Sequence, residues 1–113
     1  MKFISFKHND QNKFGIINNN KITDLTGKVS NSNTLKDLIS NQGIEEAKSY
    51  ASNNPGNIND SDIEYLPLIP NPGKIICVGL NYSEHVKETN RTVEENPVIF
   101  HRFPESQTAH LQP

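Results

Sequence analysis

The stretch Lys74-Ile75-Ile76-Cys77-Val78-Gly79 decides the fold of the C-terminal part of this chain. Its unbroken apolar run predicts a β-strand that is buried on both faces of a sheet. The next residues, Leu80-Asn81-Tyr82-Ser83-Glu84-His85-Val86-Lys87-Glu88, predict a short polar helix at about residues 83–88, with Ser83 as its N-cap. Reactive side chains are often displayed where a core strand gives way to a polar segment. We therefore expect reactive side chains within residues 80–88.

His85 and Glu88 are three residues apart, so on a helix they share a face and can touch. A carboxylate that contacts an imidazole can hold it in one tautomer and raise its basicity, which makes a general base. Asn81 and Tyr82 add polar groups beside the pair. The alternative is a solvated helix whose charges face water, and for a His-x-x-Glu pattern alone this alternative is the commoner one.

A second core-type strand is predicted at residues 97–103, and it carries His101 and Arg102. Arg102 lies between aromatic residues and could bind a substrate carboxylate through two hydrogen bonds. A surface arginine that snorkels to water fits the spacing equally well. Strands buried on both faces need neighbours, and this chain offers few. Either the rest of the sheet is missing or another chain supplies it.

The other candidate residues are weaker. We expect Cys77 to be an inert core thiol and His101 to be either structural or directed into a pocket. We interpret His8 as exposed, His110 as part of an irregular tail, and Asp60 with Asp62 as solvated loop residues. No set with metal-ligand spacing emerges, so no metal-binding residue is predicted.

Residues 1–70 predict a small N-terminal domain of strands and two short helices. Asn18-Asn19-Asn20 is predicted to be a hairpin turn, because asparagine tolerates the left-handed region. Asn33 is a plausible N-cap for the first helix, whose apolar face would hold Leu35, Leu38 and Ile39. The expected elements are strands at 2–7, 14–17 and 21–25, helices at 34–40 and 44–51, a linker or loop at 52–61, and an edge strand or connector at 63–69.

Composition excludes several classes of protein. The net charge is -2, there is no tryptophan and no basic run, so nucleic-acid binding is not expected. A single cysteine, Cys77, excludes an internal disulfide and a multi-cysteine zinc site. No stretch approaches the roughly 20 apolar residues of a membrane span, and the N-terminal apolar patch is too short for a signal peptide. We therefore expect a cytoplasmic protein that binds neither nucleic acid nor membrane.

Residues 72–113 resemble the fumarylacetoacetate hydrolase family. The resemblance rests on the Gly-x-Asn-Tyr-x-x-His-x-x-Glu pattern of residues 79–88, preceded by Pro72-Gly73-Lys74-Ile75-Ile76-Cys77-Val78 and followed by Pro97-Val98-Ile99-Phe100 and Arg102-Phe103-Pro104. Residues 1–70 resemble more loosely the small N-terminal domain of many bacterial and archaeal members. The predicted fold class is therefore α+β: a small N-terminal α/β domain (1–70), then the start of a mixed β-sandwich or β-roll catalytic domain (71–113), incomplete in this chain.

The resemblance implies a general-base dyad of His85 and Glu88, and substrate binding by Asn81, Tyr82 and Arg102. It implies hydrolysis, isomerisation or decarboxylation of a small 2-oxo or 1,3-dioxo acid, of the fumarylacetoacetate, acylpyruvate, 2-hydroxyhepta-2,4-diene-1,7-dioate or oxaloacetate type. The family uses Mg²⁺ or Mn²⁺ held by three acidic residues, and full-length members are commonly homodimers.

The chain also departs from the family. The metal-binding carboxylates of the family follow the equivalent of Pro113, and Glu105, Ala109 and Leu111 stand where small residues are common. The sequence therefore predicts an N-terminal part that carries the base but binds no metal and is inactive alone. The alternative is a non-catalytic remnant, or an interaction module that pairs with another chain.

Overall fold

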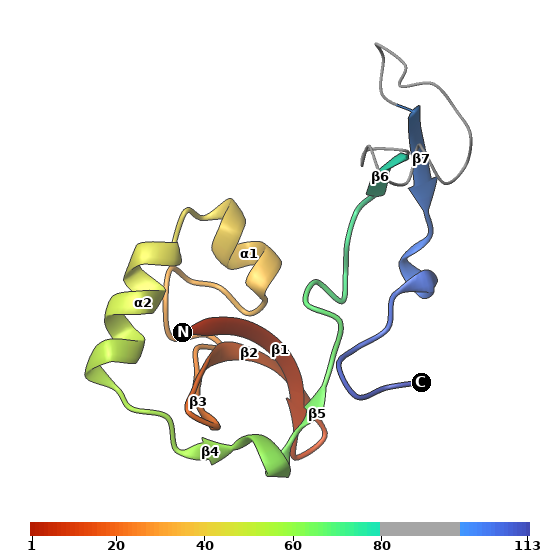
Figure 1. Ribbon diagram of the computed structural model, residues 1–113. Helices are drawn as coiled ribbons and strands as arrows, with labels where there is room; N and C mark the ends of the chain where they lie inside the picture. The colour runs from red at the N-terminus through yellow and green to blue at the C-terminus, as the bar shows by residue number, and fades with distance from the viewer. Residues whose placement is uncertain (80–97) are drawn as a thin grey trace. The chain divides into compact units, whose positions relative to one another are not determined.

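The computed structural model describes residues 1–79 and 98–113 of the chain. They form two compact units: Met1–Asn71 with Gln107–Pro113, and Pro72–Ser106. Helices and antiparallel strands occur together, as an α+β fold requires, and the sheet of the first unit is curled (Figure 1). The helix predicted at 83–88 lies outside the described residues.

The first unit is built on a five-stranded antiparallel sheet in the order β4-β3-β2-β1-β5. Its register pairs Phe3 with Ile16 and Ser5 with Phe14. Since directly paired residues share a face, these four side chains lie on the same side of the sheet. The strands are β1 (Lys2–His8), β2 (Gln11–Asn18), β3 (Lys21–Asp24), β4 (Ile58–Asn59) and β5 (Glu64–Tyr65).

Two tight turns set this register. The predicted turn between β2 and β3 is confirmed, with Asn19 at φ 50° and Asn20 at φ 62°. The turn between β1 and β2 has the same chemistry, with Asn9 at φ 49° and Asp10 at φ 58°. Two successive left-handed residues match the twist of a hairpin, and Asn and Asp adopt that conformation more readily than other non-glycine residues.

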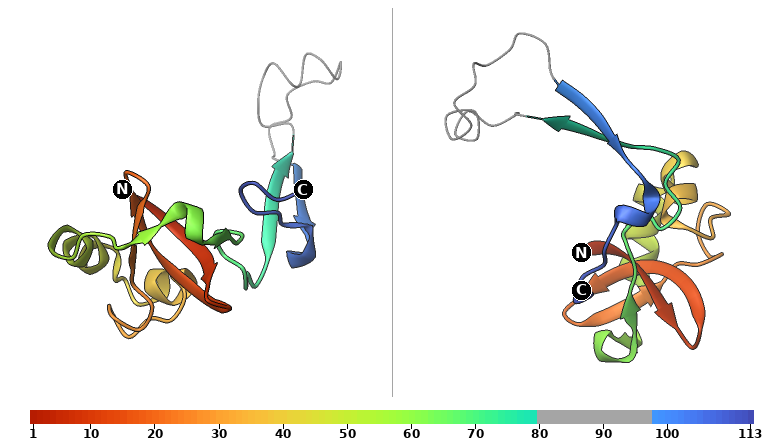
Figure 2. Two further views of the ribbon diagram at one scale, coloured as in Figure 1. Left: turned by 90° about the horizontal axis from the view of Figure 1, so that it is seen from below. Right: turned by 90° about the vertical axis from the view of Figure 1, so that its right-hand side faces the viewer.

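Helices α1 (Leu35–Ser40) and α2 (Ile44–Asn53) pack on one side of this sheet (Figures 1 and 2). Both were expected, and α2 runs two residues further than the sequence predicts. The prediction that Ile39 joins the apolar face is wrong, since its side chain is 54% exposed. The buried cluster between helices and strands consists of Phe14, Ile16, Leu25, Val29, Leu35, Leu38, Ala47 and Ala51.

Thr34, not Asn33, is the N-cap of α1. The Thr34 hydroxyl accepts a hydrogen bond from the Asp37 N–H at 3.1 Å, and the Asp37 carboxylate accepts from the Thr34 N–H at 3.0 Å. This reciprocal pair is a capping box, in which the acidic residue takes the place usually held by Glu or Gln. The hydrogen bond from the Thr34 side chain is the first cause that lowers the pKa of Asp37 below its ordinary value.

The sequence predicts a linker or loop at 52–61. In the structure this segment is not free, because part of it forms an edge strand of the sheet. Its residues Ile58 and Asn59 make β4, which pairs with β3. Thr23 Oγ1 donates to the carbonyl of Asn54 at 2.9 Å. A Cβ at Gly56 would lie 2.7 Å from backbone atoms of Ile22, so only glycine lets the segment approach so closely. A short 3-10 helix at Asp60–Asp62 follows, and β5 then confirms the edge strand expected within 63–69.

An ion pair fastens β2 to β3. Lys13 Nζ lies 2.7 Å from Asp24 Oδ2, and the two side chains are only 22% and 11% exposed. The Thr26 N–H donates to the other oxygen of Asp24 at 2.9 Å. Burial raises the pKa of Asp24, but the hydrogen bonds from Lys13 and Thr26 together outweigh it, so the net pKa is lowered.

The second unit is a two-stranded antiparallel ribbon of β6 (Ile75–Gly79) and β7 (Val98–Arg102), followed by a 3-10 turn at Pro104–Ser106. Both strands were expected. The prediction that they are buried on both faces is wrong for this chain: every residue of β7 is exposed, and Ile76 of β6 is 64% exposed. Cys77 is likewise half-buried rather than a core thiol. The apolar residues are present, but the described residues supply no layer to cover them.

The N-cap assignment can be tested by comparing Thr34→Ala with Asn33→Ala. We expect Thr34→Ala to lower the free energy of unfolding by about 1 kcal/mol, because α1 loses a cap. Asn33→Ala, the matched control, should change it by less than about 0.5 kcal/mol. Urea unfolding followed by circular dichroism measures both. A larger loss for Asn33→Ala would contradict the assignment.

The Lys13–Asp24 pair predicts a defined pH dependence. Because the folded pKa of Asp24 is depressed below its ordinary 3.8, its contribution to stability is complete above that value and is lost as the pH falls through the folded pKa. Asp24→Asn should lower the free energy of unfolding by about 1–3 kcal/mol at pH 7. It should also flatten the acid limb of the curve of stability against pH. Curves of equal slope for both proteins below pH 4 would exclude this role.

Candidate functional site

In the sequence, the predicted dyad falls between β6 and β7. His85, Glu88, Asn81 and Tyr82 fall outside the described residues, so their geometry stays a prediction. The structure does fix the ends of the segment that carries them, because Gly79 pairs directly with Val98. The segment therefore leaves and re-enters the ribbon at the same end.

Arg102 lies at the opposite end of the ribbon, where it pairs with Ile75. It is exposed on β7. Four residue steps along β7 separate it from Val98, which corresponds to roughly 13 Å.

A hollow of about 500 Å³ surrounds this end of the ribbon, lined by residues 73–76 and 99–104. Lys74 and Arg102 bring two cationic groups to it, and neither forms an ion pair with a carboxylate of the described residues. His101 packs edge-on against Phe103, with ring centroids 5.8 Å apart. A mainly apolar hollow with two cations suits a small carboxylic acid.

Lys74 is the residue that sequence reasoning missed. The sequence places Lys74 at the start of a predicted strand, and a lysine at that position does not by itself predict a binding site. The signal was the antiparallel pairing of two strands, the first directly preceded by the cation Lys74 and the second ending with the cation Arg102. Antiparallel partners bring such termini together, so Lys74 and Arg102 line one hollow.

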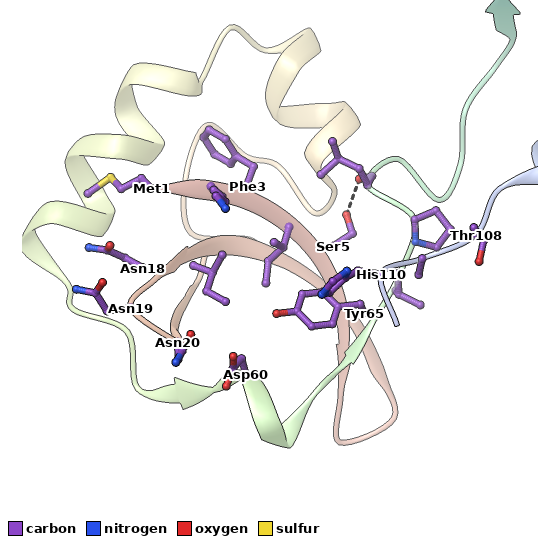
Figure 3. Close-up of a pocket in the computed structure, with 17 residues that line it drawn as sticks. Met1, Phe3, Ser5, Asn18, Asn19, Asn20, Asp60, Tyr65, Thr108 and His110 are labelled. Carbon is purple, nitrogen blue, oxygen red and sulfur yellow. Dashed lines mark hydrogen bonds between the residues drawn. The ribbon is translucent and has the colours of Figure 1, made fainter. Parts of the chain in front are cut away.

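A larger hollow, of about 880 Å³, opens on the first unit (Figure 3). None of the predicted site residues lines it, although His110 does. The His110 ring meets Tyr65 edge-on at a centroid distance of 5.1 Å, and Ser5 Oγ donates to the Leu68 carbonyl at 2.7 Å. Polar groups around the rim include Asn18, Asn19, Asn20, Asp60 and Thr108. Among the described residues, no buried side-chain nitrogen or oxygen lacks a hydrogen-bond partner.

The described residues do not form a metal cage. Nowhere in residues 1–79 and 98–113 do three His, Cys, Asp or Glu side chains come together. The Mg²⁺ or Mn²⁺ implied by the family resemblance therefore has no ligand set in this part of the chain. In the same ranges no helix is long and apolar enough to cross a membrane.

Comparison with known proteins gives partial matches. No protein-family model matches the chain. The mitochondrial oxaloacetate tautomerase fahd2 of Xenopus laevis is 41% identical over 63 residues, which is 56% of this chain and 20% of that protein. The human mitochondrial oxaloacetate tautomerase FAHD2A is 41% identical over 46 residues, or 41% of this chain and 15% of that protein.

One bacterial match covers more of the chain. An uncharacterized protein of Staphylococcus aureus is 30% identical over 115 aligned residues, which include 84% of this chain and 38% of that protein. The chain thus spans well under half the length of each of these relatives. What the comparisons establish is a partial homology of this chain to proteins named mitochondrial oxaloacetate tautomerases.

Proposed function

We propose that this chain is the N-terminal part of a fumarylacetoacetate hydrolase-type enzyme that isomerises a small oxo acid. The observation that carries the proposal is the His85–Glu88 motif, which has the pattern of that family. The similar proteins of Xenopus laevis and human are named for one isomerisation, the tautomerisation of oxaloacetate.

In the proposed reaction, the residues of this chain transfer a proton. His85 takes a proton from the carbon next to the ketone, and Glu88 holds the imidazole in the tautomer that can accept it. The carbonyl oxygen gains a proton from water, and the protonated His85 returns its proton to water, so the keto acid becomes its enol with no atom gained or lost. Arg102, with Lys74 beside it in the hollow, binds a carboxylate of the acid. Asn81 and Tyr82 bind polar groups of the substrate.

The metal of the family would polarise the ketone when bound, and by the family resemblance its ligands would follow the equivalent of Pro113. For this reason the chain alone should show no turnover. Its cytoplasmic location, and homodimer formation by a longer form, stay predictions. The non-catalytic alternative is favoured by one observation, the exposure of both faces of the ribbon, which an interaction module would also show.

A chimera tests the role of His85. Residues 72–113 of this chain replace the equivalent residues of the human oxaloacetate tautomerase, and tautomerisation is followed with Mg²⁺ present. We expect measurable activity, and a fall of kcat by about 10²–10⁴ in His85→Ala, which is the usual contribution of a general base. Glu84→Ala is the matched control, since it removes a neighbouring carboxylate outside the motif. An active chimera in which both variants behave alike would refute the dyad.

The same chimera tests Arg102. We expect Arg102→Gln to raise KM for oxaloacetate about 10- to 100-fold, because a charge-assisted hydrogen bond contributes about 1.5–3 kcal/mol. Arg102→Lys keeps the charge but loses the two-pronged geometry, so it should recover only part of the affinity. A KM unchanged in Arg102→Gln would show that this arginine only snorkels at the surface.

A further inference from the structure

The sheet of the first unit has a second face, opposite the one that α1 and α2 cover. The register defines it, because directly paired residues share a face and so do residues two apart on a strand. By these rules one set of side chains lies on the second face: Lys2, Ile4 and Phe6 of β1, Ile17 of β2, Ile22 of β3 and Tyr65 of β5. Phe6 and Ile22 are fully buried, whereas Ile4 and Ile17 are only half-buried. This face is therefore closed around Phe6 and Ile22 and open around the other two.

The hollow of about 880 Å³ lies over the open part of this face. Ile4 and Ile17 form its apolar floor, and the segment Leu66-Pro67-Leu68 lines it as a wall. Ligand pockets commonly measure about 300–1,000 Å³ and often lie in the mouths of β-barrels. The curled sheet gives this hollow a comparable size and position, so we consider it as a small-molecule site.

Polar side chains form a rim around the same hollow. Figure 3 shows Asn20, Asp60 and Tyr65 one after another along its lower side in that view, and Asn18 and Asn19 extend the row. Within residues 1–79 and 98–113 the Asp60 carboxylate forms no ion pair. An apolar floor with a polar rim suits a ligand that is apolar on one side and polar at its edge.

Hydrogen bonds hold the rim and the wall in place. At the rim, the Asp60 N–H donates to the Asn20 carbonyl at 3.2 Å. At the wall, the Leu66 N–H donates to the Ser5 carbonyl at 3.0 Å, and Ser5 Oγ donates to the Leu68 carbonyl at 2.7 Å (Figure 3). A ligand would find these elements already ordered, which lowers the entropic cost of binding.

The charges and hydrogen-bonding groups of the hollow indicate the class of ligand. One lysine and one aspartate line it, Lys2 and Asp60, so their charges cancel and a net charge on the ligand gains little. Carboxamide and phenol groups both donate and accept hydrogen bonds, as the hydroxyl groups of a sugar do. A sugar ring also presents C–H groups that can pack on an apolar floor.

We propose that this hollow binds a neutral sugar, a mono- or disaccharide. The C–H groups of its ring lie on Ile4 and Ile17. Its hydroxyl groups exchange hydrogen bonds with Asn20, Asp60 and Tyr65. This second site belongs to the first unit, and it does not depend on the proposed function.

Titration of the full 113-residue chain with glucose, galactose and maltose, followed by NMR, tests the proposal. We expect saturable shifts of the Ile4 and Ile17 methyl groups with at least one of these sugars, with a Kd on the order of 1 mM. The methyl groups of Leu35 and Leu38, which are buried beneath the helices, serve as a reference that does not shift. Glycine and acetate are the comparison ligands, and neither should give saturable shifts.

Two matched pairs of variants locate the site. Asn20→Gly removes a rim side chain but keeps a residue that adopts φ > 0, and Asn9→Gly makes the same change at a turn residue that does not line the hollow. Asp60→Asn removes the carboxylate, and Asp62→Asn does so on the same 3-10 helix, again outside the hollow. We expect Asn20→Gly and Asp60→Asn each to weaken sugar binding about fivefold, and both controls to leave it unchanged.

Several results would overturn the proposal. Non-saturating shifts with all three sugars would do so, as would saturable binding of glycine or acetate alone. Equal sugar binding by each variant and its control would show that the sugar binds elsewhere on the chain. Circular dichroism of every variant confirms that the sheet is intact, so that a loss of binding is assigned to the side chain that was removed.

Discussion

The antiparallel pairing of β1 with β2 is the constraint on which the described fold depends. It sets Phe3 opposite Ile16 and Ser5 opposite Phe14, so the apolar side chains of two strands reach the same face. A slip of one residue would send the slipped strand's members of this set to the other face, away from α1 and α2. The turn at Asn9 and Asp10 fixes this register locally, and the turn at Asn19 and Asn20 does the same for β2 and β3. The small core therefore relies on turn chemistry as much as on apolar area.

Local signals predicted most of the first unit. Strands, helices and the turn at Asn19 follow from periodicity and residue type, which act over a few neighbours. The errors occur where long-range packing decides. The polar composition of 52–61 predicts a linker, but an edge position beside Ile22 holds it in the sheet. Ile39 belongs to a helical apolar pattern, but a helix of six residues buries little more than Leu35 and Leu38.

In the candidate site, too, some residues could be predicted from their neighbours in the sequence and others only from long-range pairing. Arg102 was predicted from its neighbours along the chain, whereas Lys74 became visible only through the pairing of β6 with β7. Pairing also sets roughly 13 Å of strand between Arg102 and the end that leads to His85, a separation that spacing in the sequence does not reveal. The dyad itself rests on its motif, because its residues lie outside the described ranges. The burial of β6 and β7 shows most clearly what a sequence does not predict. The apolar pattern of a strand indicates which side chains need to be buried, but it does not indicate whether other parts of the same chain pack against them.

The pairing of Gly79 with Val98 has a thermodynamic consequence. It closes a loop around the residues that carry the proposed base, and closing a loop has an entropic cost that the ribbon must offset. A two-stranded ribbon on its own is only marginally stable in water. A partner that binds the paired form of the ribbon therefore raises the fraction of molecules in which Gly79 and Val98 are paired. Binding of such a partner and pairing of these two ends are then linked equilibria.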